Sequence, residues 1–170
     1  KNKTIKIFMK FEDIDINKII IEKSIKNSFD IKLNNKHIEL WTPELHVPFG
    51  LENKFNNYFI NLEIIDTEYA KLFEYFIEQF ESKLIEILEI SKEKLNSQLR
   101  YTDGNTIVYT KVYEKYKKII TNVKTKSNEN MTIYNIDKDS YIKANLYVDK
   151  LWFINDIYYY KFKLKDIILV

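Results

Sequence analysis

Tyrosine and lysine alternate along residues 107–118, and both residue types can bind an anion that carries flat groups. Successive side chains of an extended chain point to opposite faces, so one face here is aromatic and basic. That face holds Tyr109, Lys111, Tyr113, Lys115 and Lys117. Ammonium groups attract anions, and tyrosine rings offer faces for stacking. A plain solvated surface explains the same pattern equally well.

A second lysine-rich face is predicted in residues 159–165. Tyr160, Phe162 and Leu164 alternate there with a set that faces the other way. That set is Tyr159, Lys161, Lys163 and Lys165. The net charge is only +2, but residues 63–95 carry nine acids and four bases, whereas residues 111–128 carry six lysines and one glutamate. Any polyanion is therefore expected to bind the basic strands.

Groups that would support catalysis are sparse. The two histidines, His37 and His46, lie nine residues apart in strand-like sequence, and cysteine is absent. No zinc-protease, phosphate-loop, Gly-x-Ser-x-Gly or dinucleotide-binding glycine motif occurs. Two Asp-x-Asp pairs, at 13–15 and 137–139, are more typical of loops than of a cation site in a chain this charged. We expect a protein that is not an enzyme and that needs no cofactor and no metal.

Length and composition indicate one folded domain. With 170 residues, 45% hydrophobic and 15% aromatic, the chain can bury a core of its own. It contains no apolar run long enough to span a bilayer and no signal peptide, and the absence of cysteine fits a reducing compartment. We expect a soluble intracellular protein. Because the first residue is Lys1, we expect a fragment of a longer chain.

The first part of the chain is predicted to be extended. Residues 5–11 alternate as a half-buried strand does. Residues 29–33 and 38–40 flank an Asn-Asn pair, which predicts a hairpin. Residues 38–50 hold both prolines and one of the two glycines. Since proline cannot complete a strand ladder, we expect an irregular strand there that bends or leaves its sheet.

One long helix is expected at residues 68–95. Apolar side chains recur there at three- and four-residue spacing, and Asp66 or Thr67 can cap its start. The opposite face is acidic, which is typical of a solvated surface. Strands resume after the helix, with turns predicted at 103–104 and 155–156 and clear alternation in residues 142–148.

Strands, then one helix, then more strands predict a mostly β protein with one long α-helix. We expect an OB-fold-like antiparallel barrel with extra strands, in which the helix plugs one end. Residues 1–170 are taken as a single OB-fold-like domain, with residues 1–37 forming an N-terminal strand and hairpin extension packed on it. Other β-rich folds fit the composition equally well.

Two stretches resemble a known family. LWTPELHVPFG at residues 40–50 and KANLYVDKLWFINDIYYYKFKLKDIILV at residues 143–170 are similar to the single-stranded DNA-binding proteins of large eukaryotic DNA viruses. Those proteins are in turn similar to the single-stranded DNA-binding protein of short-tailed phages. The matching positions are Thr42-Pro43, Pro48-Phe49-Gly50 and Trp152-Phe153. The chain departs from the family pattern by a run of tyrosines at 158–160, where a glycine is expected, and by lacking an acidic C-terminal tail.

The resemblance implies an OB-fold that coats single-stranded DNA, without sequence preference, during viral DNA replication, recombination or repair. Such binding uses a cationic groove along the phosphates and aromatic faces on which bases stack. The residues that we expect to contact nucleic acid are Arg100, Tyr101, Tyr109, Lys111, Tyr113, Lys115, Lys117, Lys161 and Lys163. Trp41 and Trp152 are either stacking platforms or core residues.

An alternative of a different class stays open, namely a non-enzymatic structural or interaction module, such as a virion or assembly component, on a similar β scaffold. Under the DNA-binding interpretation the partner is single-stranded DNA. Replication proteins would bind a C-terminal tail beyond Val170, and no membrane partner is expected. The expected location is the viral replication site in the cytoplasm or nucleus of the host. The sequence leaves the oligomeric state open.

Overall fold

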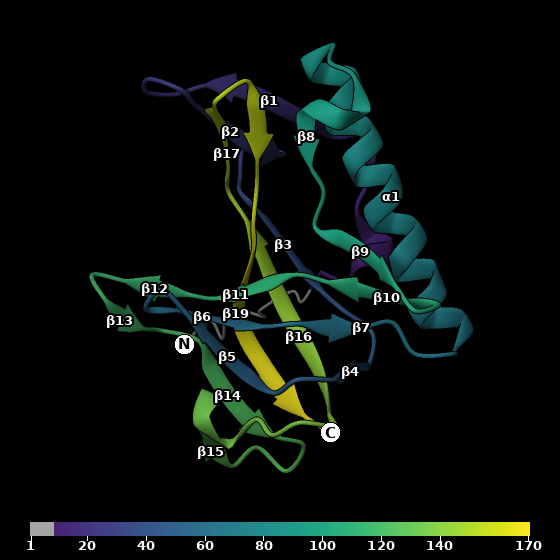
Figure 1. Ribbon diagram of the computed structural model, residues 1–170, viewed down its shortest axis with the longest axis vertical. Coiled ribbons are helices and arrows are strands. Elements are labelled where there is room, and N and C mark those ends of the chain that lie inside the picture. The colour runs from purple at the N-terminus through teal and green to yellow at the C-terminus, as the bar shows by residue number, and fades with distance from the viewer. Residues whose placement is uncertain (1–8) are drawn as a thin grey trace, which may run out of the picture.

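The computed structural model describes residues 9–170, which form two large β-sheets, one two-stranded hairpin and one long α-helix packed against the large sheets (Figure 1). The larger sheet has twelve strands and the smaller has five. Most of the predicted strand at 5–11 lies outside the described residues, and Phe11 begins a short 3-10 helix. No helix in the described part of the chain is long and apolar enough to cross a bilayer.

The strands of the larger sheet are β3 (Ile38–Trp41), β4 (Leu45–Val47), β5 (Leu51–Lys54), β6 (Asn57–Ile60), β7 (Leu62–Glu63), β9 (Leu99–Thr102), β10 (Asn105–Val108), β11 (Thr110–Val112), β14 (Asn122–Thr125), β15 (Asn130–Met131), β16 (Ser140–Val148) and β19 (Phe162–Leu169). Those of the smaller sheet are β1 (Ile19–Lys23), β2 (Ser28–Leu33), β8 (Leu95–Asn96), β17 (Lys150–Ile154) and β18 (Ile157–Tyr159). A separate hairpin pairs β12 (Glu114–Lys115) with β13 (Lys118–Ile119). The helices are α1 (Glu68–Leu88) and the 3-10 helices η1 (Phe11–Asp13), η2 (Ile16–Lys18), η3 (Lys92–Lys94) and η4 (Ile133–Asn135).

The strands β16 and β19 form the centre of the larger sheet. They pair antiparallel with each other; β16 also pairs with β3 and β4, and β19 pairs in parallel with β11 and β14. Alternate side chains of β16, such as Ile142 and Ala144, are fully buried, which confirms the alternation predicted there. The larger sheet curls into a half-barrel, so the expected class, a mostly β and OB-fold-like protein with a helix, is confirmed.

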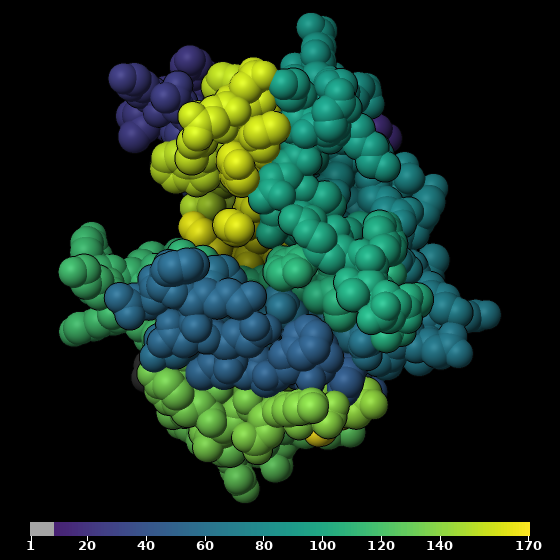
Figure 2. Space-filling view, viewed as in Figure 1, coloured from purple at the N-terminus to yellow at the C-terminus, as the bar shows by residue number. Residues whose placement is uncertain are grey.

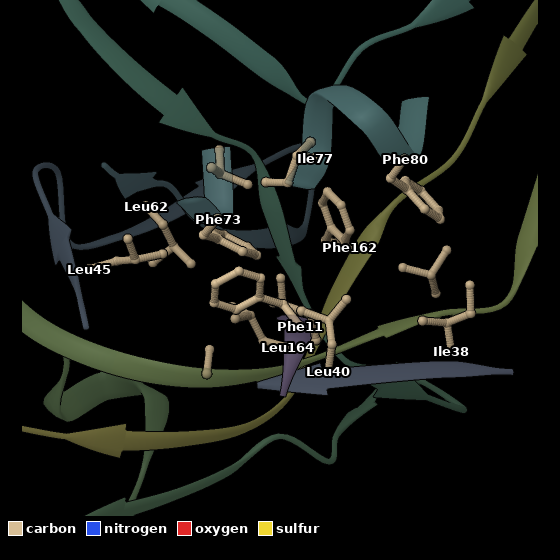
Figure 3. Close-up of a cluster of buried hydrophobic side chains, with 14 of the residues drawn as sticks. Phe11, Ile38, Leu40, Leu45, Leu62, Phe73, Ile77, Phe80, Phe162 and Leu164 are labelled. Atoms are coloured by element: carbon tan, nitrogen blue, oxygen red, sulfur yellow. The ribbon is translucent and has the colours of Figure 1, made fainter. Parts of the chain in front are cut away.

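The core lies between α1 and the inner face of the curled sheet. Figure 3 shows Phe73 and Phe80 of α1 pointing toward Phe162 of β19 and toward Phe11 near the N-terminus. The rings of Phe80 and Phe162 have centroids 6.2 Å apart, and those of Phe11 and Phe73 are 5.2 Å apart. Burying such a cluster is the main term that holds helix and sheet together.

The helix begins where the sequence predicts but ends earlier. The side chain of Thr67, rather than that of Asp66, accepts a hydrogen bond from the Ala70 N–H at 3.1 Å and caps the first turn. The helix ends at Leu88 because Glu89 adopts a left-handed conformation with φ of 53°. Residues 89–95, which the sequence predicts to be the last turns of the helix, lie outside it and lead into β8.

The hairpin predicted across residues 29–40 forms only at its turn, where Leu33 and Lys36 exchange backbone hydrogen bonds of 2.8 and 3.1 Å. Both asparagines of the turn, Asn34 and Asn35, do adopt positive φ angles of 52° and 63°. The strand that follows, β3, nevertheless pairs with β16, whereas β2 pairs with β1 and β17. A turn signal fixes where the chain bends and leaves the choice of partner strand to long-range packing.

The proline-containing stretch bends but stays in its sheet. β3 and β4 both pair with β16, and the residues between them interrupt the ladder. Thr42 bridges this gap, because its N–H donates to the Ala144 carbonyl at 2.8 Å and its Oγ1 accepts from the Ala144 N–H at 3.0 Å. A threonine side chain thereby replaces a backbone acceptor that the kink removes.

Gly50, which follows this stretch, is expected to be intolerant of a side chain. It has φ of +69°, and a Cβ there would lie 3.1 Å from the backbone nitrogen of Lys138. We expect Gly50→Ala to lower the free energy of unfolding by roughly 2 to 3 kcal/mol, since the cost of backbone strain adds to the cost of a close contact with immobile backbone.

Gly104→Ala is the matched control, because Gly104 has φ of +81° and open space around it. It is expected to cost roughly 1 kcal/mol from strain alone. Equal losses in urea unfolding would show that the Lys138 contact carries no weight.

Candidate nucleic-acid interface

Four of the residues expected to contact nucleic acid line one groove of about 280 Å³. We call it the basic groove. It is lined by Phe59, Asn96, Gln98, Arg100, Tyr109, Thr110, Lys111 and Lys161. Figure 2 shows the surface hollowed between the blue segment of β5 and β6 and the yellow and teal segments above it. The groove therefore lies where the two sheets meet, with walls from distant parts of the sequence.

The pairing of β11 with β19 positions the lysines of the groove. The two strands run in parallel with Thr110 opposite Phe162 and Lys111 opposite Lys163. Thr110 and Phe162 are buried, so their neighbours along each strand must point outward. The two lysine faces that the sequence predicts separately thus form one surface. In addition, Thr110 Oγ1 donates to the Ile60 carbonyl, which ties β11 to the end of β6.

Three cations converge in the basic groove. The Arg100 guanidinium lies 5.1 Å from the centroid of the Tyr109 ring and donates to Asn96 Oδ1 at 3.2 Å. Burial, then the charges of Lys111 and Arg100, lower the pKa of Lys161. Within residues 9–170 none of these three cations takes part in an ion pair. An anion bound here would relieve their mutual repulsion.

The outward surface continues across five strands. Cross-strand partners follow one another from Phe59 on β6 through Lys111, Lys163 and Tyr147 to Glu39 on β3. We call this line the sheet row. A row of rings and ammonium groups perpendicular to the strands offers both stacking faces and phosphate contacts.

Carboxylates partly neutralise the positive charge of the surface around Tyr113 and Tyr147. The two rings have centroids 5.4 Å apart, and Lys163 Nζ lies 5.6 Å from the centroid of Tyr113. Lys163 also forms an ion pair with Asp149 at 3.3 Å, and Lys165 pairs with Glu39. Because these cations have partners of their own, the basic groove is the stronger anion site of the two.

The remaining expected residues lie apart from the groove. Arg100 and Tyr101 are adjacent on β9 and therefore face opposite sides of the sheet. The Tyr101 hydroxyl donates to Glu78 of α1 at 2.9 Å, and burial together with this carboxylate raises the pKa of Tyr101 to about 12. Lys115 lies beside Tyr113, and Lys117 sits in the β12–β13 turn with φ of 63°. Tyr101 faces acidic surface, which is unsuited to DNA.

Sequence reasoning missed several residues of this surface, among them Tyr147, Phe59 and Asn96. Tyr147 lies in the outward set of a strand whose alternation was recognised, so the pattern could have identified it. Phe59 becomes part of this surface because β6 pairs with β11 at Lys111. Asn96 becomes part of it because β8 pairs with β18, and these two segments are more than 60 residues apart in the sequence. No local pattern reveals pairings of that kind.

Comparison with known proteins places the fold. No protein-family model matches the chain, and no curated protein matches its sequence. Solved structures of the single-stranded DNA-binding protein from bacteriophage Enc34 do match it, with a TM-score of 0.54 and coverage of 90% of this chain and 95% of that one. One is a C-terminal truncation with 10% sequence identity, and the other is in complex with single-stranded DNA with 13% identity. The chain therefore has the fold of a phage single-stranded DNA-binding protein. The resemblance to proteins of eukaryotic viruses stays a prediction.

Proposed function

We propose that this protein binds single-stranded DNA without sequence preference. The observation that carries the proposal is the basic groove, where Arg100, Lys111 and Lys161 meet beside an aromatic ring and have no ion-pair partner among residues 9–170. Phosphates would supply the missing negative charge. A protein of the same fold, from bacteriophage Enc34, is known in complex with single-stranded DNA, which supports the assignment.

The chemistry of the surface favours a single strand over a duplex. Rings such as Tyr109 and Tyr147 belong to the outward surface of the curled sheet, and stacking on a ring face is a contact that only unpaired bases can make. Cations that contact phosphates hold the strand without reading its sequence. Binding rather than catalysis is part of the proposal. So are a role in viral DNA replication, recombination or repair, a location at the viral replication site, and replication proteins as partners.

Titration with oligothymidine tests the proposal. We expect quenching of tyrosine and tryptophan fluorescence at low salt, with weaker binding to a duplex of the same length. Affinity is expected to fall with salt at a log–log slope of about −2, because each phosphate contact on a single strand contributes about −0.7 and three cations are available. Unchanged fluorescence together with no change in anisotropy of a labelled oligonucleotide would reject DNA binding and favour the structural or interaction module.

A further inference from the structure

The outer face of the smaller sheet carries an exposed tryptophan. Trp152 on β17 is 42% exposed. Its cross-strand partner is Tyr159 on β18, and the partner of Tyr159 is Asn96 on β8. We call these three residues the aromatic row. Lys150 Nζ lies 5.6 Å from the Trp152 ring, so a cation accompanies the indole.

Trp152 is not needed for the core of this sheet. The opposite face holds Phe29, Phe153 and Tyr158, and the rings of Phe153 and Tyr158 have centroids only 4.6 Å apart. Leu151, next to Trp152, is fully buried on that inner side. The indole therefore lies on the outer face, where its large flat surface contacts solvent. Of the two interpretations left open by the sequence, the core position is wrong for Trp152.

The aromatic row and the basic groove belong to one continuous face. β18 leads directly into β19 (Figure 1), and Tyr160 and Phe162 on this path are buried. Strand alternation then places Tyr159 on the same outward side as Lys161 and Lys163. The five residues from Tyr159 to Lys163 span about 13 Å, because each of the four steps between them rises about 3.3 Å in an extended strand.

Asn96 belongs to both the basic groove and the aromatic row. It lines the basic groove and is also the last member of the aromatic row. Its Oδ1 accepts a hydrogen bond from Arg100, whose guanidinium lies over the Tyr109 ring. A DNA strand that leaves the basic groove past Asn96 would meet Tyr159 and then Trp152. The three residues lie on β8, β18 and β17, which are consecutive neighbours in the smaller sheet.

We propose that the bound single strand continues from the basic groove onto the aromatic row, where one base stacks on the Trp152 indole and a neighbouring phosphate contacts Lys150. This inference rests on the proposed function and extends it to a second subsite on the smaller sheet. Tryptophan provides the largest stacking face of any side chain, and base stacking tolerates every sequence because each base has a π-face. The subsite suits unpaired nucleotides.

A single-tryptophan protein tests the path of the strand. Trp41→Phe leaves Trp152 as the only indole, and we expect its fluorescence to be quenched by oligothymidine of about 16 nucleotides, the upper range of one such fold. In the otherwise native protein, Trp152→Ala is expected to weaken binding of that oligonucleotide about tenfold, the usual size of one lost base stack. Binding of an oligonucleotide of about 4 nucleotides, which fills only the groove, is expected to stay unchanged.

Tyr75→Ala is the matched control. Tyr75 is 59% exposed on the acidic helix α1, so its loss removes an exposed ring that belongs to neither sheet and is expected to leave affinity unchanged. Trp152→Leu, which keeps an apolar side chain on the sheet, is a second variant that separates loss of the ring from loss of folding. It is expected to bind as weakly as Trp152→Ala.

Two failures are distinguishable. If the long oligonucleotide binds and changes tyrosine emission while Trp152 stays unquenched and both Trp152 variants bind normally, the strand takes another path and only this inference is wrong. If neither oligonucleotide binds the native protein, the proposed function is wrong as well.

Discussion

Reversing the charge of both lysines in the basic groove, in the variant Lys111→Glu/Lys161→Glu, is expected to weaken binding of oligothymidine roughly a hundredfold or more. Both ammonium groups lie in one groove with Arg100, so two attractive contacts with phosphates become repulsive. The log–log salt slope is expected to fall in magnitude by about 1.4, because each lost contact removes about 0.7. Fluorescence titration at several salt concentrations measures both quantities.

The fold is expected to tolerate these two substitutions. Neither lysine takes part in an ion pair within the described residues. Burial, and after it the repulsion from Lys111 and Arg100, lowers the pKa of Lys161. Removing that repulsion offsets any local cost, so the melting temperature is expected to stay nearly unchanged. Loss of binding would then report loss of the contacts themselves.

The control makes the same change of charge on another face. Lys71 pairs with Asp66 at 2.7 Å and Lys83 with Glu86 at 3.3 Å, both near or on the acidic helix. Lys71→Glu/Lys83→Glu is expected to leave affinity within about twofold of native, apart from a small effect of net charge. An equal loss in both double variants would mean that the basic groove is not where DNA binds.

Local alternation made half of this surface predictable. Buried Phe162 and Leu164 alternate with outward Lys161 and Lys163, and strand geometry alone requires this. The apposition of β11 and β19 was beyond prediction, because a parallel pairing between segments about 50 residues apart leaves no local signal. The sequence therefore indicates two basic faces and does not reveal that they are one.

The same rule explains why one expected site residue, Tyr101, lies apart from the basic groove. Arg100 and Tyr101 were taken together because both residue types suit DNA. Adjacent residues of a strand cannot share a face, and only the structure shows which side of β9 meets α1. The bond from Tyr101 to Glu78 decides it, so Arg100 faces the groove and Tyr101 faces the acidic helix. The end of α1 was likewise hidden, since a non-glycine residue, Glu89, adopts the left-handed conformation.

The largest loss of stability is expected at Glu81, a carboxylate of α1 that is only 8% exposed. Its Oε2 accepts from the Gln98 N–H at 2.9 Å and from the Tyr160 hydroxyl at 2.5 Å, and its Oε1 accepts from Ser97 Oγ at 2.5 Å. Burial and this carboxylate together raise the pKa of Tyr160 well above its usual value, so the hydroxyl stays a donor. One side chain thus holds the helix to two segments of the sheets.

Glu81→Ala is expected to lower the free energy of unfolding by roughly 3 kcal/mol. It leaves the buried Gln98 N–H and Tyr160 hydroxyl without acceptors, at about 1 to 3 kcal/mol each, while removal of a buried charge offsets part of the cost. Urea unfolding measures the change. Glu78→Ala, which removes only the exposed bond to Tyr101, is the matched control and is expected to cost less than about 0.5 kcal/mol.

The same variant also tests how the groove is held open. Gln98 lines the basic groove, and Tyr160 immediately precedes Lys161, so Glu81 is bonded to one residue of the groove wall and to the chain neighbour of another. At a temperature well below unfolding, Glu81→Ala is therefore expected to weaken oligothymidine binding several-fold, because Arg100 and Lys161 lose their fixed separation. The salt slope is expected to stay unchanged, since every cation is still present. A native affinity in a destabilised protein would mean that the network maintains the fold alone, and that the spacing of the groove cations is set by β11 and β19.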